Sequence, residues 1–179
     1  MTRWVALLRG VNVGGVAVRS ADLAALFREQ GFGQVKTVLA TGNVVFDADT
    51  EPATAEATAL KSLIETALSE RFGYDAWIVL VPQQDIARRA SAYPFELDDA
   101  RQPYILFGSD DAVLDELFDA AQALGSPEDR IARGDGVLYW SLPKGRSTDT
   151  PVAKLVAKAK YRSTTTNRNL RTVERIASA

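Results

Sequence analysis

The sequence contains no cysteine and no histidine. Without cysteine there is no disulfide, no thiolate nucleophile and no zinc–thiolate site. Histidine is the usual general base near neutral pH and the commonest metal ligand, so Ser-His-Asp triads, HExxH zinc sites and Cys-His dyads are also excluded. We therefore expect no cofactor, assign no catalytic or metal-ligating residue, and favour a non-catalytic protein.

Long hydrophobic runs are missing too. No run approaches the roughly 18–20 apolar residues of a membrane-spanning helix, and the apolar stretch at the start is too short for a signal peptide. We expect a cytoplasmic protein with no membrane partner, which the lack of cysteine also fits. The chain is otherwise of ordinary globular composition, with 46% hydrophobic and 25% charged residues among its 179.

Charge is unevenly distributed along the chain. Of 21 basic and 23 acidic residues, nine basic and only two acidic ones lie from Lys144 to the end, a net charge of +7. The preceding residues carry −9. Two interpretations remain open: a basic segment attracted to the acidic body of its own chain, or a site for a phosphate or polyanion such as a nucleotide or nucleic acid.

The first half predicts the order strand, helix, strand, strand, helix, strand. The short apolar run 4–8 is typical of a buried strand, and the first helix ends at a glycine, Gly31. Gly42 and Asn43, between two β-type runs, favour a hairpin, with a bulge in one long strand as the alternative. This is the ferredoxin-like β-α-β-β-α-β order, which we assign to residues 1–82.

Residues 83–179 predict a second, incomplete β-α-β-β-α unit followed by a C-terminal helix. Asp135-Gly136 lies between two strand-like runs and predicts a hairpin with a type I′ turn. Pro151 is typical of a first helical turn and opens a helix to Tyr161. No fourth strand is expected, because the polar stretch 163–167 leads into the terminal helix. The fold class is α+β, in two units or in one integrated domain.

Three segments are candidates for binding an anion. The glycine-rich loop 9–15 lets backbone N–H groups approach a ligand, although its glycines can equally well only turn the chain. Three arginines fall on one face of a terminal helix that starts near Asn167. They can bind phosphate, or they can be paired with acidic groups of the same chain. A turn at 144–148 lacks the spacing of a phosphate-binding P-loop, so a solvated loop is the alternative. The candidate contacts in these segments are Arg9, Asn12, Gly14, Gly15, Lys144, Arg146, Arg168, Asn169, Arg171 and Arg175.

The chain also resembles a known family. Ala6–Gly15, Thr41-Gly42-Asn43-Val44-Val45-Phe46 and Asn167–Val173 together are similar to the bacterial domain-of-unknown-function family 1697. The resemblance implies an α+β fold with ferredoxin-like parts and implies no activity. It adds Gly42 and Asn43 to the candidate ligand contacts. Many members carry tryptophan where Leu170 stands, so a stacking contact there would be absent from this chain.

Three functions are consistent with these patterns. The first is a non-catalytic binding module for a phosphate-bearing ligand, a nucleotide or nucleic acid, that uses the glycine-rich loop and the basic C-terminal helix. The second is a small-molecule-sensing regulatory protein, by analogy with ferredoxin-like regulatory domains. The third is a histidine-independent enzyme, for which no residue pattern places a base beside a nucleophile.

Overall fold

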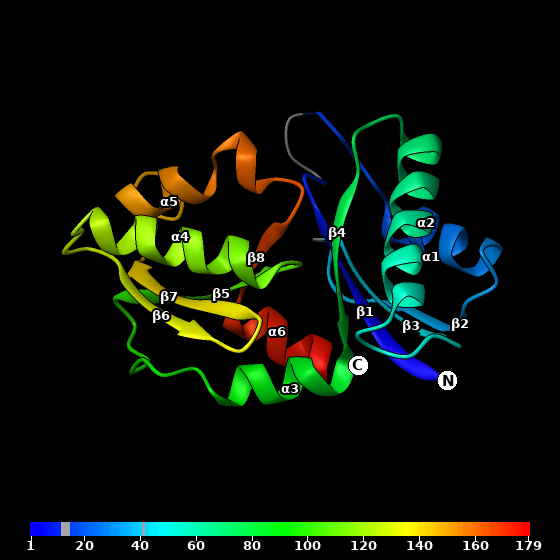
Figure 1. The fold of residues 1–179 in the computed structure, drawn as a ribbon, viewed down its shortest axis with the longest axis horizontal. Coiled ribbons are helices and arrows are strands. Elements are labelled where there is room, and N and C mark those ends of the chain that lie inside the picture. The colour runs from blue at the N-terminus through cyan, green and yellow to red at the C-terminus, as the bar shows by residue number, and fades with distance from the viewer. Residues whose placement is uncertain (12–14, 41) are drawn as a thin grey trace. The chain divides into compact units, whose positions relative to one another are not determined.

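The computed structural model describes residues 1–11, 15–40 and 42–179. They form two compact units, Met1–Ala87 with Glu174–Ala179, and Arg88–Val173. Each unit contains one four-stranded antiparallel sheet, which confirms the α+β fold class (Figure 1). Among the described residues, no helix has the length and apolar character needed to cross a bilayer.

The first unit has the predicted ferredoxin-like order, and its strands pair in the sequence β2-β3-β1-β4. The helix α3 (Gln83–Ser91) begins directly after its last strand. Gln83 donates from Nε2 to the carbonyls of Ile176 (3.0 Å) and Ala179 (3.1 Å), which holds the end of the chain to this unit. The elements before α3 are β1 (Thr2–Arg9), α1 (Ser20–Glu29), β2 (Gly33–Thr37), β3 (Asn43–Ala48), α2 (Ala55–Phe72) and β4 (Trp77–Pro82).

The core of the first unit lies between the sheet and its two helices. Alternate residues of β1, Trp4, Ala6 and Leu8, face α1 and α2, where Phe27 and Ile64 are fully buried. Thr54 caps α2 by accepting the N–H of Ala57 at 3.2 Å, and Gly73, with φ 68°, is the C-cap after its last residue, Phe72.

One polar group in this core lacks a partner. The hydroxyl of Tyr74 is buried and makes no hydrogen bond to any described residue, and burial raises the pKa of this phenol to about 12. A buried hydroxyl without a partner carries a desolvation penalty of about 1–3 kcal/mol. We therefore expect Tyr74→Phe to be at least as stable as the wild type in urea unfolding at pH 7.

The same phenol makes stability depend on alkaline pH. Its pKa is about 10 in the unfolded chain and higher in the folded one. Ionisation of this phenol is therefore harder in the folded state than in the unfolded chain. Its effect on stability is absent below pH 10, and stability falls as the pH rises towards 12. Tyr74→Phe should remove this part of the alkaline destabilisation. An unchanged pH profile between pH 9 and pH 11.5 would contradict the burial of Tyr74.

The second unit is complete, so the prediction of an incomplete unit was wrong. A fourth strand, β8, pairs with β5, and the sheet order β6-β7-β5-β8 repeats that of the first unit. The terminal helix α6 follows, at Leu170–Ala177. The predicted helix from Pro151 is also shorter than expected and ends at Val156. The other elements are β5 (Arg101–Gly108), α4 (Asp111–Ala123), β6 (Arg130–Gly134), β7 (Val137–Pro143), α5 (Pro151–Val156), a 3-10 turn η1 (Ala159–Tyr161) and β8 (Thr165–Asn169).

The polar composition of β8 explains why it was missed. Its residues, Thr-Thr-Asn-Arg-Asn, show no apolar alternation, yet Thr165 and Thr166 are buried. Thr165 satisfies its hydroxyl by donating to the carbonyl of Tyr161 at 2.7 Å. The predicted hairpin at Asp135-Gly136 is confirmed, but the turn is not type I′, because only Gly136 of the pair has a positive φ.

Candidate functional site

Two loops meet at one end of the first unit's sheet. β1 ends at Arg9 and β3 begins at Asn43, and these strands pair with Leu7 opposite Asn43. The segments 10–19 and 38–42 therefore leave the sheet at the same end. Gly42, at φ 75°, accepts the N–H of Leu8 at 2.9 Å, and a Cβ there would lie only 2.6 Å from Cγ2 of Val11. The two loops are thus in contact at Gly42.

The second loop is shaped by Asn43 and by a strained leucine. Asn43 is fully buried and donates from Nδ2 to the carbonyl of Val38 at 2.8 Å, while Val38 N–H donates back to its carbonyl at 2.9 Å. Leu39 has φ 58° and is 43% exposed. A left-handed conformation without glycine costs of order 1–3 kcal/mol. Asn43 therefore holds the loop in shape, and the exposed Leu39 is the strained position.

The glycine-rich loop places backbone without side chains and a positive charge at the end of the sheet where the two loops meet. At Gly10 (φ 80°) and Gly15 (φ 88°), no heavy atom of the described residues comes within 4 Å of where a Cβ would stand, so the described surroundings leave room for a ligand. Arg9 is half-buried opposite Trp77 of β4. Asn12 and Gly14, two further predicted contacts, lie outside the described residues.

The second unit has the same sheet order as the first, so the lengths of the corresponding loops can be compared. Its registers match, because Phe107 faces Val137 as Leu7 faces Asn43, and Gly136 accepts the N–H of Gly108 at 3.4 Å as Gly42 accepts that of Leu8. Yet the second unit joins the equivalent elements with only residues 109–110 and 135–136. Two-residue turns are therefore enough for this topology. The corresponding loops of the first unit, residues 10–19 and 38–42, are longer than the fold requires.

The turn at 144–148 has a structural role. Arg146 donates from Nε to Asp149 at 2.7 Å, a bond that raises the pKa of its guanidinium. Its Nη1 lies 2.8 Å from Oε2 of Glu128, as an ion pair without hydrogen-bond alignment. Gly145 has φ 82° and donates its N–H to Oε1 of Gln102 at 3.2 Å. Two carboxylates neutralise Arg146, so of the two cations only Lys144, which is exposed, remains a candidate contact.

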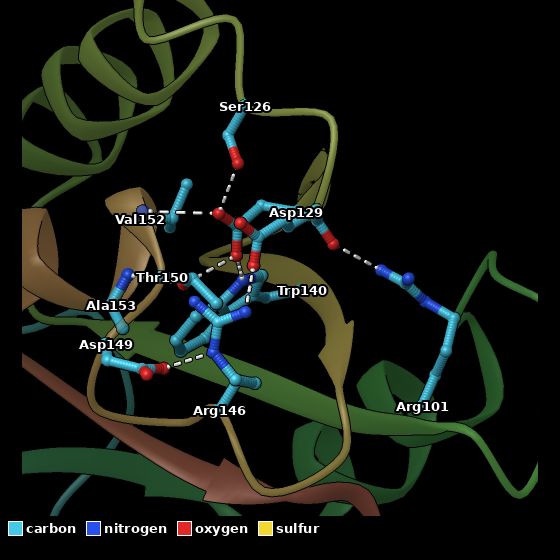
Figure 2. Close-up of polar contacts among 10 residues, drawn as sticks. Arg101, Ser126, Asp129, Trp140, Arg146, Asp149, Thr150, Val152 and Ala153 are labelled. Atoms are coloured by element: carbon cyan, nitrogen blue, oxygen red, sulfur yellow. Dashed lines mark hydrogen bonds and ion pairs between the residues drawn. The ribbon is translucent and has the colours of Figure 1, made fainter.

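A carboxylate that the sequence patterns did not single out lies beside this turn. Figure 2 shows Asp129 accepting four hydrogen bonds from three segments of the second unit. Oδ1 accepts from Trp140 Nε1 (2.8 Å) and Thr150 Oγ1 (2.9 Å), and Oδ2 from Ser126 Oγ (2.7 Å) and Val152 N–H (3.3 Å). With its oxygens engaged, Asp129 is an anchor for the start of α5. No sequence spacing identifies it, because its partners lie up to 23 residues away.

The predicted arginine face of the terminal helix was partly wrong. Arg168 lies on β8, is only 7% exposed, and donates from Nη1 to Thr166 Oγ1 (2.7 Å) and to the carbonyl of Asn167 (2.8 Å). Asn169 precedes the helix and accepts the N–H of Arg171 at 2.9 Å, as an N-cap does. Of the three arginines, Arg171 and Arg175 lie on α6, four residues apart, and both are exposed, as is Glu174 between them. Leu170 is buried.

The comparisons with known proteins support the fold. A family model described as "Protein of unknown function (DUF1697)" matches residues 1–139, a range that includes both loops of the first unit. The solved structure of the conserved bacterial protein SP0830 from Streptococcus pneumoniae is 23% identical, with a TM-score of 0.81, over 99% of this chain and 97% of that one. This similarity shows a shared fold. No curated protein matches the chain.

Proposed function

The chain belongs to the DUF1697 family of proteins of unknown function, and we propose that it binds a phosphate-bearing small ligand, such as a nucleotide, at the loop end of its first unit. The loop end comprises residues 9–11, 15–19, 38–40 and 42. The observation that carries this proposal is the extra length of both loops at one end of a sheet, because the second unit builds the same topology with two-residue turns.

The chemistry of the loop end favours an anion. Its only ionisable side chains are those of Arg9 and Arg19, and it contains no carboxylate. An arginine fork binds phosphate through two parallel N–H donors, and glycines allow backbone N–H groups to come close to the same oxygens. Guanidinium groups do not act as bases near neutral pH, so this end of the sheet is suited to binding and not to proton transfer.

Isothermal titration calorimetry with nucleoside mono- and triphosphates tests the proposal. We expect saturable binding that Arg9→Ala weakens about tenfold, as loss of a charge-assisted hydrogen bond would. Arg71→Ala, which removes an exposed cation from α2, should leave affinity unchanged. In a second variant, the Asp-Gly turn of the second unit replaces residues 38–42. It should keep cooperative unfolding and lose binding. Wild-type affinity in this folded variant would refute the site.

A nucleic-acid partner remains a proposal for the basic C-terminal segment. No acidic residue occurs in 150–173, and Lys154, Lys158 and Arg162 are exposed, with no carboxylate among the described residues paired to them. When the logarithm of the duplex binding constant is plotted against the logarithm of the salt concentration, replacing all three by alanine should make the slope less steep by about three. Lys160→Ala is the matched control, because Lys160 is already bound to Glu116. Equal slopes would count against this partner.

We further propose that the protein is bacterial and acts in the cytoplasm. The reducing cytoplasm disfavours disulfides, and the chain has no cysteine to form one. The source of the protein with the similar fold, Streptococcus pneumoniae, is a bacterium. Detection of the protein in the soluble fraction of lysed cells, together with a cytoplasmic marker, tests the location.

A further inference from the structure

A basic groove lies along β2, the edge strand of the first unit. Its volume is about 570 Å³, and β1, α1 and β2 contribute to it. Three of its six lining residues are cations and none is acidic. The lining consists of Arg3, Arg28, Phe32, Gln34, Val35 and Lys36.

A β-bulge in β2 shapes this groove. The pairing of β2 with β3 shifts register between Gly33 and Lys36, and Gln34 has φ 45°, a strained value for a residue with a side chain. The carbonyl of Gln34 accepts from Arg3 Nη1 at 3.3 Å, and that of Val35 accepts from Arg28 Nη2 at 3.4 Å. The irregular backbone thus orients both guanidinium groups.

The charge in the groove is only partly neutralised. Arg3 pairs with Asp47 at 2.9 Å, whereas Arg28 and Lys36 are exposed and no carboxylate among the described residues pairs with either. The second unit shows the opposite arrangement. There Arg133 on the edge strand β6 is held by Asp111 (3.1 Å) and Asp115 (2.9 Å) of α4. The first unit places another cation, Arg28, on the corresponding helix.

We propose that this groove binds the dianion of a phosphate monoester. Arg28 supplies a fork of N–H donors and Lys36 a point charge, which together match the two negative charges. The amide of Gln34 offers a further neutral donor. Phe32, packed against Phe27 and Phe46, gives the organic part of the ligand an apolar wall. The groove is lined by none of the residues of the loop end, so this inference does not depend on the function proposed above.

Amide chemical shifts of the full chain, titrated with phenyl phosphate, test this site. We expect saturable shifts at residues 28 and 33–36, and about tenfold weaker binding in Arg28→Ala/Lys36→Ala, since charge-assisted contacts are lost. Arg71→Ala/Arg175→Ala removes the same charge from exposed positions of the same unit and should bind as the wild type does.

Three results would overturn the proposal. One is the absence of saturable shifts at tens of millimolar phenyl phosphate. Another is an equal loss of affinity in both double variants, which would indicate general charge attraction. The third is equal shifts with phenol, which would show that the phosphate is not recognised.

Discussion

Asp129→Ala should lower the free energy of unfolding by about 2–6 kcal/mol, because it removes the acceptor of four hydrogen bonds. Two of the donors, Trp140 Nε1 and Thr150 Oγ1, belong to side chains that are 2% and 0% exposed. Each buried donor left without a partner costs about 1–3 kcal/mol. The variant also loses the carboxylate that accepts the N–H of Val152 in the first turn of α5. Urea unfolding followed by far-UV circular dichroism measures the change.

Two further variants separate this role from a general effect of charge. Asp119→Ala removes an exposed carboxylate from α4 and should change stability by less than about 0.5 kcal/mol. Asp129→Asn keeps one acceptor oxygen but turns an N–H₂ group towards two donors, so it should be intermediate. If Asp129→Ala and Asp119→Ala unfolded at the same urea concentration, Asp129 would not anchor α5.

The sequence was sufficient for the fold wherever apolar residues form a continuous run or recur at a regular spacing. β1 and β7 are nearly continuous apolar runs, and helices such as α4 have a regular apolar face, so their positions follow from periodicity. β8 lacks that signal, because pairing with β5 and buried hydroxyl hydrogen bonds stabilise it in place of apolar side chains. Its omission moved the predicted terminal helix towards the N-terminus and placed Arg168 on the wrong element.

The candidate site was harder to predict, because the sequence does not show whether a cationic or amide side chain already has a partner in the fold. Arg146 is neutralised by Glu128, 18 residues away, and the amide of Asn43 is engaged by the carbonyl of Val38. These partners are set by tertiary structure and leave no local pattern. The sequence itself shows Arg9 beside several glycines, but it could not show that two loops meet there.

The two units together distinguish what the fold requires from what was added to it. Both use a positive-φ glycine, Gly42 or Gly136, whose carbonyl accepts an N–H from the end of the first strand of the unit. That glycine is therefore part of the fold in both units. The longer loops, the strained Leu39 and the half-buried Arg9 occur on the first unit alone, which is why we place ligand binding there.

Gly42→Ala should be the most damaging glycine substitution at the loop end, with a loss of about 2–5 kcal/mol of unfolding free energy. The left-handed backbone costs an alanine about 1–2 kcal/mol. Its Cβ would also lie 2.6 Å from Val11 Cγ2 and 2.9 Å from Leu8 Cβ, and overpacking of this kind costs about 1–3 kcal/mol more. Because both neighbours are buried, neither can move aside freely.

Gly10→Ala and Gly15→Ala provide the comparison. Both positions have a positive φ, as Gly42 has, and no heavy atom of the described residues lies within 4 Å of the new methyl group. They should lose only the backbone contribution, about 1–2 kcal/mol. The difference between Gly42→Ala and these two variants in urea unfolding thus measures the contact between the two loops. If all three lost the same amount, the loops would not be packed against each other at Gly42, and the loop end would lose the geometry on which the proposed ligand site depends.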